Sequence, residues 1–385
     1  MSDTAVGTNA VRHVYLHVPF CARRCSYCDF SIAVRRTVPW RAFADAVARE
    51  VEVRTVAQPQ TTLDTLYLGG GTPSHLGVDG VQATLDGLRP YLSWNEATEV
   101  TLEANPEDIS VEAVRAWKAA GVNRLSIGIQ SFDDRVLTWM HRVHDAARAE
   151  AAVEAARAGG IDAFSVDLIF AAPERLERDW SDDVSRILAL GADHVSLYGL
   201  TIEPHTPLGR WHARGEEQEA DESRYEAEFL EAHNRLTAAG YEHYEVSNFG
   251  RVGRRARHNS AYWRGVPYLG LGPAAHGFDG VDRRWNLSAY AAWDDAVTAG
   301  ADPVEGRETL SSENQIAESV YLGLRTIDGL EVRGAHEIAH VQRWREEGWV
   351  KLQERDGTTR LVCTAEGWLR LDALAADLTA FRSGS

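Results

Sequence analysis

The feature that most constrains the fold is an alternation of strand-type and helix-length segments over the first two thirds of the chain. The strand-type segments are short and rich in branched apolar and aromatic residues, and helical periodicity separates each from the next. They lie at residues 12–18, 65–68, 98–104, 124–129, 164–169 and 194–200. This repeat predicts an α/β protein whose parallel strands curve into a partial (β/α)6 barrel.

Two of the intervening helices carry boundary signals. Pro39 favours a helix start, since proline fits the first helical position, and apolar residues then recur at helical spacing as far as Val51. A second helix is expected from about Val111 to Gly121, because glycine suits the position that follows a helix end.

Three of the four cysteines fall within eight consecutive positions, directly after the first strand-type segment. Cys21, Cys25 and Cys28 form a C-x3-C-x2-C loop, whereas Cys363 lies near the C-terminus and is expected to be a buried small hydrophobe. Structural disulfides fit this spacing poorly. Zinc is an alternative, since C-x2-C is half of a zinc knuckle, although no second close pair of ligands stands nearby. A cubane iron–sulfur cluster with one iron left open fits better.

Other unusual residues also occur at or just after predicted strand ends. The glycine turn 69–73 follows the second strand, Glu103 lies on the third, Gln130 follows the fourth and Asp167 lies on the fifth. Taken singly, each has an ordinary explanation as a turn residue, a solvated strand end or a polar group bonded to backbone. Together they predict a site, because barrel enzymes build their sites at the carboxyl ends of strands.

Composition excludes several classes of function. The formal net charge of −17 and a sequence pI near 5.3 disfavour nucleic acid as a partner. No stretch approaches the ~20 apolar residues that a membrane-spanning helix needs. The first dozen residues carry neither a basic nor an apolar signal region, and the sparse cysteines suit a reducing interior. We therefore expect a cytoplasmic protein.

The sequence suggests three domains. Residues 1–202 form the predicted barrel, 203–307 an α+β extension without the clean repeat, and 308–385 a C-terminal domain. Amphipathic helices in this last range, followed by a hairpin pattern around Asp356-Gly357, predict a winged-helix-like domain. Because it lacks a basic stripe, a packing or lid role is favoured over DNA binding.

The cysteine loop and the turn Gly69-Gly70-Gly71-Thr72-Pro73, at this interval, resemble radical SAM enzymes. In that chemistry S-adenosylmethionine (SAM) completes a [4Fe-4S] cluster and is cleaved reductively to a carbon radical. The glycines would let backbone groups approach the methionine amino group of SAM. Within the superfamily, nearly the whole chain is similar to the coproporphyrinogen III oxidase-like group, and most similar to its heme-chaperone branch, HemW.

The resemblance assigns site residues by position but no catalytic residue. It gives Cys21, Cys25 and Cys28 to the cluster. It places Tyr27 beside the cluster. The residues that it assigns to contact with SAM are Tyr15, Gly70, Gly71, Thr72, Glu103, Gln130, Arg142 and Asp167, with Gly199 as a looser match. The side-chain chemistry suits these roles. Glu103 can take the ribose or amino group, Gln130 and Asp167 can accept hydroxyl hydrogens, and Arg142 can pair with the carboxylate.

Two features favour the chaperone branch over the oxidase. The oxidase carries a further cysteine at the position of Phe30, and the run 258–263 matches an H-N-x-x-Y-W element of HemW. The residues implied in heme binding are His258, Asn259, Tyr262 and Trp263, with His276 as a weaker candidate. The ordinary alternative is that His258 caps a loop and the two aromatic rings fill an interface.

The expected function is therefore a heme chaperone that keeps a [4Fe-4S] cluster and SAM and transfers heme to an acceptor apoprotein. This function is compatible with an electron donor to the cluster and with peripheral contact with a membrane. The alternative is a radical SAM oxidase that decarboxylates coproporphyrinogen III. A third hypothesis is a regulatory interaction protein that acts through its C-terminal segment. Whether the protein is an enzyme, and whether it cleaves SAM, stays open at this point.

Overall fold

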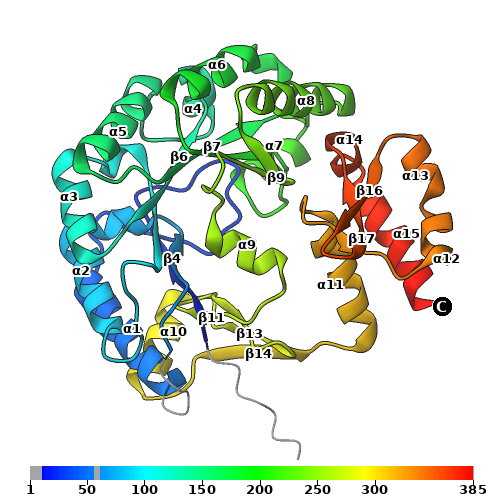
Figure 1. Cartoon of the computed structure of the whole chain (residues 1–385). Helices are drawn as coiled ribbons and strands as arrows, with labels where there is room; N and C mark the ends of the chain where they lie inside the picture. The colour runs from blue at the N-terminus through cyan, green and yellow to red at the C-terminus, as the bar shows by residue number, and fades with distance from the viewer. Residues whose placement is uncertain (1–10, 56–60, 385) are drawn as a thin grey trace, which may run out of the picture. The chain divides into compact units, whose positions relative to one another are not determined.

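A computed structural model describes residues 11–55 and 61–384 of the chain (Figure 1). These residues form two compact units, each assembled from stretches that are distant in sequence. Unit 1 combines 11–55 and 61–129 with 139–164 and 266–309, and unit 2 combines 130–138 with 165–265 and 310–384. The predicted linear division at residues 202 and 307 differs from these units and stays a prediction about domain organisation.

Unit 1 is built on parallel strands. Their order is β11-β1-β4-β5-β6, and each neighbouring pair is parallel. The strands are β1 (His13–Val18), β4 (Thr65–Gly70), β5 (Glu99–Ala104), β6 (Arg124–Gln130) and β11 (Leu269–Leu271). Most of their residues are buried on both faces, as expected for parallel strands covered by helices. The predicted strands in this region are confirmed, each within two residues of its expected ends.

Helices on the outside of these strands follow the chain in order (Figure 1). They are α1 (Trp40–Thr55), α2 (Gly77–Leu88), α3 (Val111–Ala120) and α5 (Ala146–Gly159), and each packs on the next. The predicted boundaries are confirmed. α1 begins directly after Pro39, and α3 ends at Gly121, which has a φ of 112° and donates its N–H to the Lys118 carbonyl.

Strand β11, which lies in a glycine-rich run, was not predicted from the sequence. A Cβ at Gly270 would lie 1.8 Å from the His276 carbonyl oxygen, and one at Gly272 would lie 2.3 Å from the His17 carbonyl oxygen. Gly272 also has a φ of 89°, which favours glycine. These glycines therefore let the backbones of three strands meet closely.

The rest of unit 1 is mostly a small antiparallel sheet. It contains β12 (His276–Phe278), β13 (Asp282–Asn286) and β14 (Val304–Thr309), with α10 (Tyr290–Thr298) between the last two. Two short parallel strands, β2 (Phe20–Cys21) and β3 (Ala33–Val34), flank the cysteine loop.

A buried carboxylate on α1 bonds to β13, to α10 and to the residue that follows β11. Glu50, on α1, accepts hydrogen bonds from Gly272 N–H at 2.7 Å and from Trp293 Nε1 on α10 at 3.1 Å. It also accepts a bond from Asn286 Nδ2 on β13 at 2.6 Å. Arg54 Nη1 lies 3.5 Å from the same carboxylate. Burial raises the pKa of Glu50, and these partners oppose the rise.

We predict that Glu50→Ala lowers the free energy of unfolding by about 3–5 kcal/mol, because it leaves buried donors and a buried cation without their acceptor. Denaturant unfolding measures the change. The control is Asp45→Ala, which removes an exposed carboxylate from the same helix and should change stability by less than about 0.5 kcal/mol. Equal effects of the two variants would contradict this account of Glu50.

Unit 2 continues with a shorter, mixed set of strands. Their order is β7-β8-β10-β9, in which β7 and β8 are parallel and the other pairs antiparallel. The strands are β7 (Phe164–Phe170), β8 (His194–Gly199), β9 (Glu242–Glu245) and β10 (Asn248–Gly250). The helices are α4 (Asp134–Trp139), α6 (Trp180–Leu190), α7 (Pro207–Ala213), α8 (Glu222–Ala238) and α9 (Arg257–Trp263). The two strands predicted at 164–169 and 194–200 are confirmed.

The C-terminal part of unit 2 has helices and a three-stranded antiparallel sheet, β15-β17-β16. The elements are α11 (Ser312–Leu324), β15 (Leu330–Glu331), α12 (Ala335–His340), α13 (Gln342–Glu346), β16 (Val350–Arg355), β17 (Thr358–Cys363), α14 (Ala365–Trp368) and α15 (Leu371–Ser383). The predicted hairpin is confirmed, with positive φ at both Asp356 and Gly357. Two short helices, α12 and α13, meet at Val341, a β-branched residue poorly suited to a helix interior. The winged-helix-like character stays a prediction.

The structure thus confirms the α/β class, with a mixed set of strands and surrounding helices. Cys363 is buried, as expected for a residue that packs as a small hydrophobe. None of the helices within 11–55 and 61–384 is both long and apolar enough to cross a membrane.

Candidate cluster and cofactor site

The three loop cysteines lie in unit 1, directly after strand β1. Cys21 ends β2 and is buried, whereas Cys25 and Cys28 are half-buried, and all three are free thiols. The loop is held by a backbone hydrogen bond from Ser26 N–H to the Met140 carbonyl, at 3.0 Å. The sequence therefore folds the cysteines at the carboxyl end of a parallel strand, as predicted.

Two of these thiols are protonated before a metal binds. Burial raises the pKa of Cys21 to about 12 and that of Cys28 to about 11, so metal binding must displace their protons. Within the described residues, no three His, Cys, Asp or Glu side chains are gathered tightly enough for one metal ion. A cubane cluster does not need three side chains to converge on one ion, because each thiolate binds a different iron.

The glycine turn packs directly on the cysteine loop. A Cβ at Gly71 would lie 2.7 Å from the Pro19 carbonyl oxygen and 3.0 Å from Cys21 Sγ. Gly70 has a φ of 114°, and a Cβ there would lie 2.6 Å from the His17 ring. Thr72 Oγ1 donates a hydrogen bond to Cys21 Sγ at 3.3 Å. Larger residues at these positions would push the turn away from the cysteines.

Glu103 is held beside the turn by two donors. Gly70 N–H donates to Glu103 Oε2 at 3.0 Å, and Tyr67 Oη donates to Oε1 at 2.7 Å. Tyr15 lies close by, with its ring stacked on Tyr67 at 6.1 Å. Burial, with a smaller contribution from Glu103, raises the pKa of Tyr15 well above its ordinary value. The phenol of Tyr15 therefore stays protonated next to a carboxylate.

Arg142 brings a positive charge to the cysteine loop. Its Nη1 lies 3.6 Å from Cys25 Sγ, and its Nη2 donates to Asn105 Oδ1 at 2.6 Å and to the Gly128 carbonyl at 2.7 Å. Burial alone would lower the pKa of Arg142, but the neighbouring Tyr27 and Cys25 raise it. Arg142 and Tyr27 thus lie beside the cysteine loop.

Sequence reasoning missed Asn105, which bonds to both Arg142 and Thr72. The available signal was a polar residue directly after a strand and directly before Pro106. Such a residue is fixed in an extended conformation at the edge where sites form.

The remaining SAM candidates lie in unit 2. Gln130 ends β6 in a left-handed conformation, with a φ of 71°. Asp167 lies on β7, opposite Ser196 of β8. Gly199 ends β8, and a Cβ there would lie 2.3 Å from Tyr225 Oη. Packing against Tyr225 is therefore enough to explain a glycine at position 199, without any contact to SAM.

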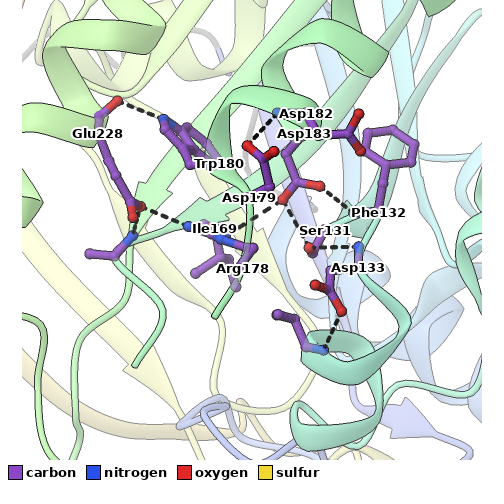
Figure 2. Close-up of polar contacts among 12 residues, drawn as sticks. Ser131, Phe132, Asp133, Ile169, Arg178, Asp179, Trp180, Asp182, Asp183 and Glu228 are labelled. Atoms are coloured by element: carbon purple, nitrogen blue, oxygen red, sulfur yellow. Dashed lines mark hydrogen bonds and ion pairs between the residues drawn. The ribbon is translucent and has the colours of Figure 1, made fainter. Parts of the chain in front are cut away.

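A buried ionic cluster in unit 2 holds the residues that follow Gln130 (Figure 2). Asp183, on α6, accepts hydrogen bonds from Phe132 N–H at 2.7 Å and from Ser131 Oγ at 2.9 Å. Arg178 Nη1 lies 3.6 Å from the same carboxylate, and burial raises the pKa of Asp183. The left-handed turn at Gln130 is thus fixed by the residues next to it.

The other side of this cluster holds the end of β7 (Figure 2). Arg178 also donates to Glu228 at 2.7 Å and to the Ile169 carbonyl at 2.6 Å. Glu228 in turn accepts the Ala171 N–H at 2.7 Å, where Ala171 has a φ of 58°. One buried arginine therefore connects the loops after two strand ends.

We predict that Asp183→Ala lowers the free energy of unfolding by about 3–5 kcal/mol, since it leaves a buried guanidinium and a buried N–H without this acceptor. The neighbouring Asp182 is exposed and provides the control. Asp182→Ala should change stability by less than about 0.5 kcal/mol in the same denaturant experiment. A loss in Asp183→Ala no larger than that of the control would show that the cluster does not hold this turn.

The predicted heme residues lie on or at the end of α9 in unit 2. His258 is 1% exposed, and its Nε2 lies 2.9 Å from Tyr262 Oη. The spacing of four residues places both on one helix face. Asn259 and Trp263 are half-buried, and the guanidinium of Arg325 lies 4.7 Å from the Trp263 ring centre. Binding of heme iron through Nε2 therefore requires the contact with Tyr262 to open. His276, the weaker candidate, is exposed on β12 of unit 1.

Known proteins that resemble this chain belong to the radical SAM superfamily. Residues 15–187 match the family model of the radical SAM superfamily. The chain is 37% identical to the heme chaperone HemW of Mycobacterium tuberculosis, over 95% of this chain and 94% of that protein. It is 34% identical to HemW of Bacillus subtilis, over 83% and 85% of the two chains.

Among solved structures, the chain resembles the coproporphyrinogen III oxidase HemN of Escherichia coli, a radical SAM enzyme. The TM-score is 0.79 at 21% identity, and the match covers 97% of this chain and 91% of that one. At this identity the likeness shows the fold. It confirms the predicted fold class.

Proposed function

Since this chain belongs to the HemW family within the radical SAM superfamily, we propose that it is a heme chaperone that binds heme and passes it to an acceptor protein. The observation that carries the proposal is the match to curated heme chaperones over nearly the whole length of both chains. Family membership also implies a [4Fe-4S] cluster and SAM.

Cys21, Cys25 and Cys28 would hold three irons of the cluster, which when reduced supplies the electron for SAM cleavage. The proposed SAM contacts are Tyr15, Tyr27, Gly70, Gly71, Thr72, Glu103, Gln130, Arg142, Asp167 and Gly199. What these residues offer follows from their surroundings. Glu103 is preoriented by two donors, and the raised pKa of Arg142 keeps a positive charge for a carboxylate.

For heme, we propose His258, Asn259, Tyr262 and Trp263. The contact between His258 Nε2 and Tyr262 Oη keeps a buried imidazole satisfied when heme is absent. Such a hydrogen bond contributes a net ~1 kcal/mol, so an iron–imidazole bond can replace it at small cost. The Tyr262 hydroxyl therefore competes with heme for the same nitrogen.

The four free cysteines suit a reducing compartment, and we infer a cytoplasmic location. The acceptor is a heme-binding apoprotein. The comparisons favour the heme chaperone over the regulatory hypothesis for the C-terminal segment.

The rival function is oxidative decarboxylation of coproporphyrinogen III, the activity named for the oxidase whose fold this chain shares. Against it, the position of the further oxidase cysteine is occupied here by Phe30, whose side chain is 59% exposed. An anaerobic assay with SAM and a reductant separates the two. Product formation that depends on Cys21, Cys25 and Cys28 would replace the chaperone proposal.

We predict that the reconstituted full-length protein binds heme near stoichiometrically at micromolar concentration, as measured by a visible-absorbance titration. His258→Ala should weaken binding at least ~10-fold, a loss of ~1.4 kcal/mol. Tyr262→Phe keeps the ring but removes the competing hydroxyl, so it should bind heme at least as tightly as the unmodified protein.

The control is His205→Ala, which removes an exposed histidine from unit 2 and should leave heme binding unchanged. Absence of heme binding at micromolar concentration would overturn the proposal. Unchanged binding in His258→Ala would overturn the assignment of His258.

A further inference from the structure

We propose that Asn105 is a positioning residue that directs the hydrogen bonds received by two of the cluster cysteines. The inference concerns the environment of the cluster and does not depend on heme binding. It rests on a continuous set of contacts within unit 1 that runs from Cys21 through Thr72, Asn105 and Arg142 to Cys25.

The backbone of Asn105 is fixed from several directions. It follows the last residue of β5 and precedes Pro106, which disfavours helical angles, and it has φ −87° and ψ 145°. Its N–H donates to Ser74 Oγ at 3.1 Å, and Ser74 Oγ donates to Asp108 Oδ2 at 2.6 Å. The side-chain amide is therefore presented from a rigid position.

The two ends of that amide act on different partners. Asn105 Nδ2 donates to Thr72 Oγ1 at 3.3 Å, and Asn105 Oδ1 accepts from Arg142 Nη2 at 2.6 Å. A threonine hydroxyl has one proton, so a donor that occupies its oxygen leaves that proton for another acceptor. The acceptor is Cys21 Sγ, 3.3 Å away.

At the other end, the Asn105 carbonyl fixes the orientation of a planar guanidinium. With Nη2 bonded to Asn105 and to the Gly128 carbonyl, Nη1 lies 3.6 Å from Cys25 Sγ. The geometry of guanidinium donors is rigid, so fixing one nitrogen aims the other. A single amide thus sets the donors to two of the three cysteine sulfurs.

Hydrogen bonds to the sulfurs are one of the factors that set the reduction potential of an iron–sulfur cluster. Donors withdraw negative charge from a thiolate and make the reduced state more favourable. Loss of the Asn105 amide should therefore make the midpoint potential more negative. The residue acts through Thr72 and Arg142 and need not touch the cluster.

The test is a redox titration, followed by electron paramagnetic resonance, of anaerobically reconstituted full-length protein. Asn105→Ala should lower the ratio of reduced to oxidised cluster about tenfold at a fixed solution potential, which is ~59 mV for one electron. Thr72→Val removes the bond to Cys21 and the acceptor of Asn105 Nδ2 but leaves Arg142 held by Asn105, so it should give a smaller shift in the same direction. Because Asn105 acts through Thr72, the double variant should shift less than the sum of the two.

The matched control is Asn123→Ala. The Asn123 amide accepts Val100 N–H at 2.8 Å and donates to the Thr98 carbonyl at 2.7 Å, near the amino end of β5. Its loss should reduce stability but leave the potential unchanged. An unshifted potential in Asn105→Ala would overturn the proposal, as would an equal shift in the control or an additive double variant. Loss of the cluster in Asn105→Ala would also overturn the proposal, because Asn105 would then be needed to hold the fold around the cluster and not to direct hydrogen bonds to its sulfurs. All these readouts are independent of heme.

Discussion

The register between β1 and β4 is the constraint on which the candidate site depends. His17 pairs with Gly69 and Val18 with Gly70, and Gly71 N–H donates to the Val18 carbonyl at 2.8 Å. This register places the glycine turn next to the start of the cysteine loop. The two strand ends can meet so closely only because Gly70 and Gly71 carry no side chains.

Polar networks then fix the conformation around this contact. In unit 1, Asn105 and Arg142 connect the glycine turn to the loop residue Cys25, while Glu103 bonds to the turn itself. In unit 2, Arg178 and Asp183 fix the turn after β6. Each network places a charged group in a buried or partly buried position, which is costly unless its partners are complete. The same residues therefore determine local stability and the geometry of the proposed cofactor site.

The sequence predicted the features that depend on local pattern. The parallel strands, the end of α3 at Gly121 and the cysteine loop after the first strand are all found. The sequence did not predict features that depend on contacts between distant residues. β11 has three residues and reads as a turn until its pairing with β1 is known. Asn105 carries no motif, and the burial of His258 against Tyr262 follows from packing around α9.

Metal analysis of oxygen-free protein tests most directly whether the three loop cysteines hold a [4Fe-4S] cluster. Purified anaerobically, the protein should contain about four irons and four sulfides per chain. Replacement of Cys21, Cys25 or Cys28 by serine should abolish both, whereas Cys363→Ser should retain them. Protein that contains only zinc, or iron that survives loss of the loop cysteines, would contradict the account.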